Sequence, residues 1–190
     1  MTDAKEIATM LIKATAMADN DIFTDPTEPL YTTIDYYRMA CHSLFECKRC
    51  GTCCITGDPI RLKYEDIAKI AKHLKIPTNK AIKKLTVPDP HKPGVLDFKH
   101  ILPCKFYDIE AKVCKIYHVR PWSCRIFPFL GIYGSDNQVK VNESCPGSVE
   151  TMKILTAAIE ETRIHIAVSA FSVEEVRRAK EKLRAVLEKV

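Results

Sequence analysis

The pattern of hydrophobic and polar positions predicts helices at both ends of the chain. Apolar residues recur at helical spacing from Ile7 to Met17 and again from Leu30 to Leu44. The acidic residues and prolines of 25–29 suit the start of the second helix. Because Cys41 lies on the apolar stripe of that helix, we expect it to be a buried core thiol rather than a ligand.

The C-terminal segment has the same character. One helix is predicted from Val149, with apolar residues three and four positions apart as far as Ile166. Ser172 and Glu175 form a capping box that opens a final helix. The flanking segments 1–44 and 149–190 can therefore bury apolar surface by packing helix against helix.

The middle of the chain is less periodic. Short helices are predicted at 67–74 and 79–85, a loop or irregular connection at 86–103, and a small hairpin around the polar residues 134–137. The expected fold class is mainly α with a small β-hairpin. Its cysteine-rich central region, 45–148, is stapled by metal and flanked by the N- and C-terminal helices.

Composition favours an ordinary globular protein. The chain has 190 residues, of which 46% are hydrophobic and 28% charged, so we expect a single domain over 1–190. No stretch approaches the roughly 20 apolar residues of a membrane span. The first residues lack the apolar segment of a signal peptide. These features predict a cytoplasmic protein with no membrane partner.

Eight of the nine cysteines fall into motifs that are typical of metal ligands. In a reducing cytosol, spaced thiols bind metal more often than they form disulfides, and an odd count argues against full pairing. Disulfides stay an alternative, because intracellular proteins of hyperthermophiles can be rich in them. The predicted metal ligands are Cys47, Cys50, Cys53, Cys54, Cys104, Cys114, Cys124 and Cys145.

The spacing favours an iron–sulfur cluster, with zinc as the alternative. Cys47, Cys50 and Cys53 match the first three positions of the bacterial ferredoxin run, which holds a 4Fe-4S cluster. Here Cys54 follows directly, and a Cys-Pro element appears only at Cys145. Neighbouring residues in extended chain point to opposite sides, so one centre or two centres are both open.

Four polar side chains near the later cysteines are candidates for tuning the centre or binding a substrate. Arg120 and Arg125 bracket Cys124, where they could neutralise a negative centre, hold an anionic substrate group or form structural salt bridges. Lys105 and His118 are the other two candidates, although a hydrogen-bonding loop histidine is the simpler interpretation of His118. No catalytic residue is identified.

Together the motifs resemble those of a known family. They are Phe45-x-Cys47-x2-Cys50-Gly51-x-Cys53-Cys54, Tyr64-Glu65-Asp66-Ile67, Pro103-Cys104-x-Phe106, Cys114-x-Ile116-Tyr117, Arg120-Pro121-x2-Cys124-Arg125-x-Phe127-Pro128 and Cys145-Pro146-Gly147. The combination resembles the CxxCxxCC family, also called the YkgJ-type cysteine-cluster family, which is described as zinc- or iron-chelating. The resemblance implies eight cysteine ligands. Some members are labelled iron–sulfur oxidoreductases, and the flagellin lysine methylase, a larger and more distant relative, suggests methyl transfer.

Three kinds of function remain open. The first is a redox or cluster-dependent enzyme, possessing a pocket near Arg120, Arg125 or Lys105. The second is a zinc-binding structural or metal-carrier module without catalysis. The third is nucleic-acid binding, but the lysines are interpreted as an ordinary solvated face. The formal charge of +5 would fall to about +1 with two metal centres on eight thiolates, so nucleic acid is not an expected partner. Metal ions are expected, with an unknown protein or small molecule.

Overall fold

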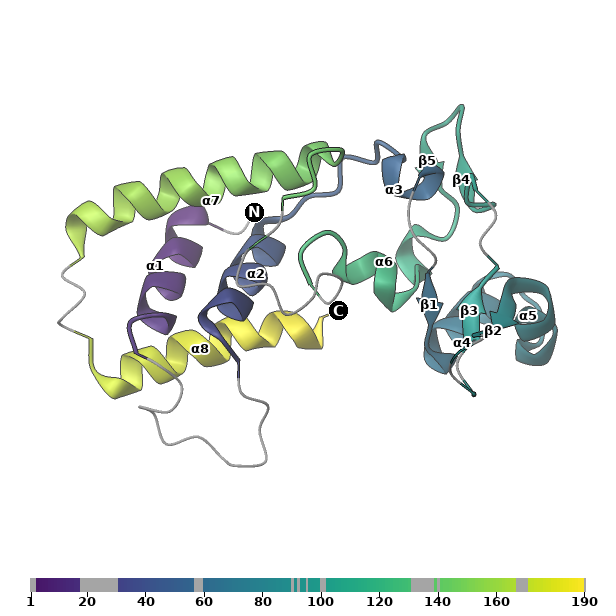
Figure 1. Cartoon of the computed structure of the whole chain (residues 1–190), viewed down its shortest axis with the longest axis horizontal. Coiled ribbons are helices and arrows are strands. Elements are labelled where there is room, and N and C mark those ends of the chain that lie inside the picture. Colours follow the sequence, from purple (N-terminus) through teal and green to yellow (C-terminus); the bar gives the residue numbers. More distant parts are fainter. Residues whose placement is uncertain are drawn as a thin grey trace. The chain divides into compact units, whose positions relative to one another are not determined.

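A computed structural model describes residues 3–17, 31–56, 60–89, 91, 93–94, 96–99, 102–130, 139, 141–166 and 171–189. The chain divides into two compact units (Figure 1). Unit 1 comprises residues 1–46 and 128–190, and unit 2 comprises residues 47–127. The predicted cysteine-rich region therefore spans all of unit 2 and reaches into unit 1, and the single domain stays a prediction.

In its described residues, unit 1 is built from four helices. They are α1 (Ala4–Ala14), α2 (Thr33–Leu44), α7 (Pro146–His165) and α8 (Val173–Glu188). Helix α1 packs against both α7 and α8, and α2 packs against the other three. The helices bury side chains such as Leu11, Met39 and Leu155, each about 1% exposed. The terminal helices predicted from apolar spacing are thus confirmed.

Three details of unit 1 bear on the sequence predictions. Cys41 is completely buried on α2, which confirms the predicted core thiol. Helix α2 begins at Thr33, because Thr32 and Asp35 form a reciprocal capping box there. The start suggested by residues 25–29 lies outside the described residues. The predicted capping box of Ser172 and Glu175 is present at the start of α8.

Unit 2 has short elements packed around a small core. Its helices are α3 (Thr52–Ile55), α4 (Tyr64–His73), α5 (Thr78–Leu85), the 3-10 helix η2 (Tyr117–Val119) and α6 (Trp122–Ile126). Its strands are β1 (Arg61–Leu62), β2 (Thr86–Pro88), β3 (Leu96–Phe98), β4 (Tyr107–Asp108) and β5 (Val113–Cys114). Ile67, Ile70, Leu85 and Phe98 form the centre of one apolar cluster, against which Cys104 and other residues pack.

The strands form two antiparallel sheets. One has the order β1-β3-β2, and the other is the hairpin β4-β5. The segment predicted as a loop, 86–103, therefore contains strands β2 and β3. Each strand is three residues long, which is too short for an alternation of apolar and polar residues to be recognised in the sequence. Of the hairpin predicted around 134–137, residues 127–130 form no strand, and 131–138 lie outside the described residues.

The fold class is mainly α with small β elements, as predicted. Most described elements are helices, and the two sheets are short. Within the described ranges, no helix has both the length and the apolar character required to cross a lipid bilayer.

Candidate metal centre

The cysteine run lies in a tight turn that leads into α3. Gly51 has a φ of +79°, a left-handed conformation that favours glycine, and its backbone begins the short helix that carries Cys53 and Cys54. A Cβ atom at this position would overlap the ring and hydroxyl group of Tyr107. The glycine therefore permits both the turn and the close approach of the β4-β5 hairpin.

Main-chain contacts bring the hairpin cysteines to this turn. The N–H of Cys104 donates to the carbonyl oxygen of Cys54 at 2.7 Å. Tyr107 and Cys114 are paired across β4-β5, and the N–H of Tyr107 donates to the carbonyl of Cys104 at 2.8 Å. Cys104 and Cys114 are both half-buried and pack against the apolar cluster of unit 2. Three separate segments thus meet at one side of the unit.

Helix α6 contributes Cys124 and is held in place by a buried carboxylate. Asp66, on the first turn of α4, is 1% exposed. Its Oδ1 accepts a hydrogen bond of 3.0 Å from the backbone N–H of Trp122 and lies 3.6 Å from the guanidinium of Arg125. Its Oδ2 accepts from the N–H of Lys63 at 3.2 Å. The carboxylate therefore connects the start of α4 with the start of α6.

Five thiols interact electrostatically in this part of unit 2. They are Cys53, Cys54, Cys104, Cys114 and Cys124. A hydrogen bond from Cys54 lowers the pKa of Cys53 to about 7, and the same hydrogen bond, followed by burial, raises the pKa of Cys54. Burial raises the pKa of Cys124 to about 12 and is also the main cause of the raised pKa of Cys114. One thiol is therefore ready to ionise near neutral pH, while the raised pKa values of Cys54, Cys114 and Cys124 keep these three thiols protonated.

The other predicted ligands are placed differently. Cys50 is exposed and accepts a 3.5 Å hydrogen bond from the hydroxyl of Thr52, and Cys47 is half-buried. Cys145 belongs to unit 1, where it is buried at the N-cap of α7. Beside it, a Cβ on Gly147 would lie 2.5 Å from the carbonyl oxygen of Glu46, so the Cys-Pro-Gly turn packs closely on the backbone of Glu46 and the ring of Phe45.

The interacting thiols do not make up a formed metal site in the ranges that the structure describes. In the described part of the chain, no group of three or more histidine, cysteine, aspartate or glutamate side chains has a geometry that would hold a metal ion. Ligation by the eight cysteines therefore stays a prediction. The donor set itself fits zinc or an iron–sulfur cluster, because thiols are soft ligands and both groups are bound by thiolates.

The basic candidates differ in their surroundings. The Arg120 guanidinium lies 4.1 Å from the centre of the Tyr117 ring, and its charge favours the ionised forms of Cys53, Cys114 and Cys124. Arg125 donates to the carbonyl oxygen of Arg120 at 3.0 Å, in addition to its contact with the α4 carboxylate. Arg120 thus interacts electrostatically with the thiols, while Arg125 holds the backbone of Arg120 by a hydrogen bond.

His118 and Lys105 are largely held by aromatic rings, and Lys105 also interacts electrostatically with Cys104. His118 is exposed and lies edge-on to the Tyr117 ring, with 5.8 Å between the ring centres. The ammonium of Lys105 lies 5.4 and 5.5 Å from the ring centres of Phe98 and Phe106. Burial, followed by repulsion from Lys84 and Lys99, lowers the pKa of Lys105.

Sequence reasoning missed three residues of this site. Asp66 was quoted only as part of a motif, although its position three residues after Lys63 is the spacing of a helix cap. Tyr107 lies over Gly51. Its pKa is raised chiefly by burial and then by electrostatic interaction with Cys54, Cys50 and Cys53. Tyr117 contacts both Arg120 and Arg49, the latter at 5.1 Å. In the sequence, Tyr117 is distinguished only as part of the motif Cys114-x-Ile116-Tyr117, and Tyr107 has no sequence feature that distinguishes it from a core aromatic residue.

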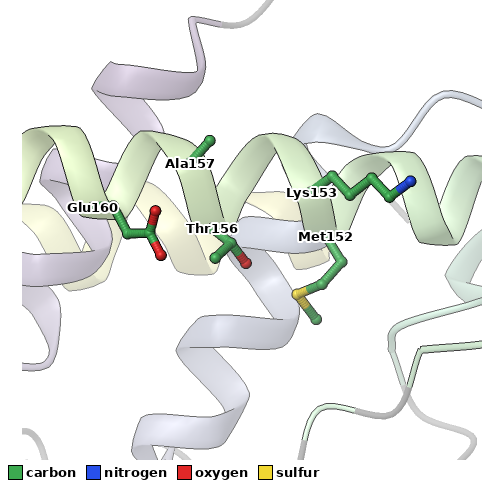
Figure 2. A pocket seen from close by; sticks show the side chains of 5 residues that line it. All are labelled: Met152, Lys153, Thr156, Ala157 and Glu160. Atoms are coloured by element: carbon green, nitrogen blue, oxygen red, sulfur yellow. The ribbon is translucent and has the colours of Figure 1, made fainter.

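A shallow hollow lies on a different part of the protein (Figure 2). All of its lining residues come from α7 of unit 1, and none is a cysteine; they are Met152, Lys153, Thr156, Ala157 and Glu160. Figure 2 shows these side chains projecting from one stretch of a single helix, without converging polar groups. The hollow therefore gives no support to a substrate pocket at the cysteines.

Comparison with known proteins identifies the cysteine-rich region. A family model described as "CxxCxxCC: Putative zinc- or iron-chelating domain" matches residues 46–146, more than half of the chain. The "Uncharacterized protein MJ0661" of Methanocaldococcus jannaschii is 38% identical over 86 residues, which cover 45% of this chain and 44% of that protein. The chain thus spans less than half the length of this relative. No solved structure matches the chain.

Proposed function

Because this chain belongs to the CxxCxxCC family, whose description is zinc or iron chelation, we propose that its cysteines hold an iron–sulfur centre. Family membership supports the binding of metal ions by the chain. The finer assignment to iron and sulfide, with a 4Fe-4S cluster as the first choice, is our inference from the cysteine spacing and the thiol environment.

The observation that carries the proposal is the gathering of five thiols from four separate segments of unit 2. These segments are the run that ends at Cys54, the chain before β4, strand β5 and helix α6. Unit 2 has a small apolar core, and ordering its short elements costs about 1–2 kcal/mol of backbone entropy per residue. A metal centre bound only by the folded chain would contribute its binding free energy to folding and offset part of that cost.

The thiol environment supports an anionic, thiolate-ligated centre. Metal binds the thiolate form of cysteine, and the pKa of Cys53, lowered to about 7, makes that form accessible near neutral pH. Arg120 supplies positive charge beside the sulfurs, which would stabilise a net-negative centre and shift its reduction potential. The remaining ligands would come from Cys47, Cys50 and Cys145, as two nearby four-cysteine centres or as one larger cluster.

A bound iron–sulfur cluster would supply electron transfer or cluster-dependent chemistry such as methyl transfer. Such a centre suits a cytoplasmic protein, since a reducing compartment keeps its thiols free of disulfides. The role of Arg120 in this proposal is to balance charge at the sulfurs. Arg125 and Asp66 keep the segment with Arg120 and Cys124 in place.

The identity of the metal can be tested directly. Protein purified anaerobically is examined by visible absorption and assayed for iron, sulfide and zinc. We expect broad absorption near 400 nm and iron and sulfide in about equal amounts, since a 4Fe-4S cluster contains four of each. A colourless protein that contains zinc would refute the iron–sulfur assignment and establish the structural or carrier module instead. A protein without either metal would refute both.

The ligands can be tested with single substitutions. Cys104→Ser and Cys124→Ser should lower the bound metal, because both sulfurs belong to the group of five interacting thiols. Cys41→Ala is the matched control, since this thiol is completely buried on α2 of unit 1. Full metal retention in Cys53→Ser, Cys104→Ser and Cys124→Ser would contradict the proposed site.

A further inference from the structure

The two units carry opposite net charge. Residues 47–127, which form unit 2, contain 17 lysines and arginines against 7 aspartates and glutamates, a formal charge of +10. Residues 1–46 and 128–190, which form unit 1, contain 12 against 17, a charge of −5. The whole-chain value of +5 therefore conceals a strongly basic unit and an acidic one.

Metal binding would not remove this excess. Seven of the predicted cysteine ligands belong to unit 2. If all seven bound two zinc ions or two oxidised clusters as thiolates, the charge of unit 2 would still be about +7. The basic residues therefore exceed what the metal centre requires, and a concentration of positive charge in one unit favours an anionic partner.

The excess is most concentrated on α4, α5 and the turn between them. Residues 67–88 contain no aspartate or glutamate but six lysines: Lys69, Lys72, Lys75, Lys80, Lys83 and Lys84. All six are exposed, and within the described residues none of their ammonium groups has a carboxylate partner. Lys99 and Lys105 extend this lysine surface, since the Lys99 ammonium donates to the carbonyl oxygen of Lys83 at 2.9 Å and Lys105 is repelled by both Lys84 and Lys99. Such a surface repels itself unless anions are bound to it.

We propose that this lysine surface, defined by the six lysines of 67–88 with Lys99 and Lys105, binds the phosphate backbone of a nucleic acid. Lysine ammonium groups are point charges that suit sequence-independent phosphate contacts. A protein partner fits less well, because lysine is depleted in protein–protein interfaces. A membrane partner also fits less well, since α4 and α5 direct their aliphatic residues, such as Ile67, Ile70 and Leu85, into the core of unit 2, and the exposed Tyr64 alone does not make an apolar face for lipid.

This inference does not depend on which metal the cysteines bind. It departs from the expectation drawn from whole-chain charge, because that sum mixes two units of opposite sign. A failure of this inference can be told apart from a failure of the proposed metal centre, because metal content and nucleic-acid binding are measured separately on the same preparation of full-length protein.

The test is fluorescence polarisation with two labelled probes, a 20-nucleotide single-stranded RNA and a 20-base-pair DNA duplex. We expect dissociation constants on the order of 1–100 µM, with affinity falling steeply between 50 and 200 mM salt. The two probes show whether RNA or DNA is preferred, and binding of either supports the proposal. Failure of both probes to bind at 50 mM salt would overturn it.

Matched triple variants locate the surface. Lys80→Gln/Lys83→Gln/Lys84→Gln removes three charges from α5 and should weaken binding about tenfold or more, with a salt slope shallower by about 3. The control Lys153→Gln/Lys182→Gln/Lys189→Gln removes three exposed charges from unit 1 and should leave the affinity within about twofold. Circular dichroism and metal content verify that both variants fold.

Two outcomes would assign the surface to something else. Equal losses in the two triple variants would mean that only total charge matters and would overturn the proposed location. Binding to poly-glutamate or to phosphatidylserine vesicles, with neither nucleic-acid probe bound, would replace the nucleic acid with an acidic protein or a membrane surface.

Discussion

Replacing Asp66 should destabilise unit 2 far more than replacing the residue beside it. Asp66 is 1% exposed and accepts hydrogen bonds from the backbone N–H groups of Lys63 and Trp122 at 3.2 and 3.0 Å. Its carboxylate also lies 3.6 Å from the guanidinium of Arg125, whose side chain is 23% exposed. One side chain thus accepts hydrogen bonds from backbone N–H groups at the starts of two helices and balances the charge of a partly buried guanidinium.

The magnitude follows from these three contacts. Removing the carboxylate leaves the backbone N–H groups of Lys63 and Trp122 without this acceptor and takes one of its partners from Arg125, and the loss of one partner of a buried ion pair costs about 3–5 kcal/mol. A hydrogen bond to a charged group contributes about 1.5–3 kcal/mol, but the contributions are not additive. We therefore expect Asp66→Ala to cost about 4 kcal/mol. Asp66→Asn keeps an oxygen acceptor without the charge and should cost about 2 kcal/mol.

The chain provides its own probe for this experiment. Trp122 is the single tryptophan and lies at the start of α6, where its N–H contacts Asp66. Urea unfolding followed by tryptophan fluorescence therefore reports on the affected helix. The matched control is Glu65→Ala, which removes an exposed carboxylate from the same turn and should cost about 0.5 kcal/mol.

Two results would refute this reasoning. If the free energy of unfolding of Asp66→Ala lies within about 1 kcal/mol of that of the natural protein, the carboxylate does not connect the two helices. If Glu65→Ala costs as much as Asp66→Ala, the effect arises from helix α4 alone. Metal content gives a second check, because α6 carries Cys124, and we expect Asp66→Ala to retain less metal than Glu65→Ala.

Two further substitutions test the turn at the cysteine run and the core of unit 1. Gly51→Ala should destabilise the protein by about 3 kcal/mol or more, because it adds a clash with Tyr107 to a left-handed conformation. Gly94→Ala, with a φ of +81° and open space around it, should cost only about 1–2 kcal/mol; equal costs by urea unfolding would exclude the clash. Burial raises the pKa of Cys41 from 9.0 to about 12, so its neutral thiol favours the folded state below pH 9 and this contribution is lost as the pH rises from 9 to 12. Between pH 9 and 12 the natural protein should therefore lose up to about 4 kcal/mol of its free energy of unfolding, and Cys41→Ala should lack this loss. Unfolding followed by circular dichroism measures both proteins, and identical dependence of their stability on pH would contradict the prediction.

The sequence predicted the helices best where burial is one-sided. In α1, α2 and α8, a single stripe faces the other helices, so apolar spacing alone locates the element and, for Cys41, the buried thiol. The start of α8 was predicted as well, because a capping box depends on two side chains only three residues apart. The start of α2 was less clear, since acid and proline at 25–29 resemble a cap that Thr32 and Asp35 in fact provide.

Unit 2 was harder to predict because its elements are short and depend on tertiary contacts. Strands β2 and β3 have three residues each, and their pairing is visible only once Thr86 lies opposite Phe98. The same limit applies to Tyr107, whose contact with Gly51 joins residues 56 positions apart. Periodicity contains no information about contacts of this kind.

The charge distribution shows the same limit at the level of whole units. A net charge is a property of a surface, and the surface is defined only after the boundary residues of each unit are known. Here unit 1 is formed from both ends of the chain, so its acidic residues are separated in sequence by the basic residues of unit 2. Averaging over 190 residues cancels much of the basic excess that a partner of unit 2 would encounter. A Debye length of about 8 Å at physiological salt means that such a partner responds to nearby lysines and not to the sum over the chain.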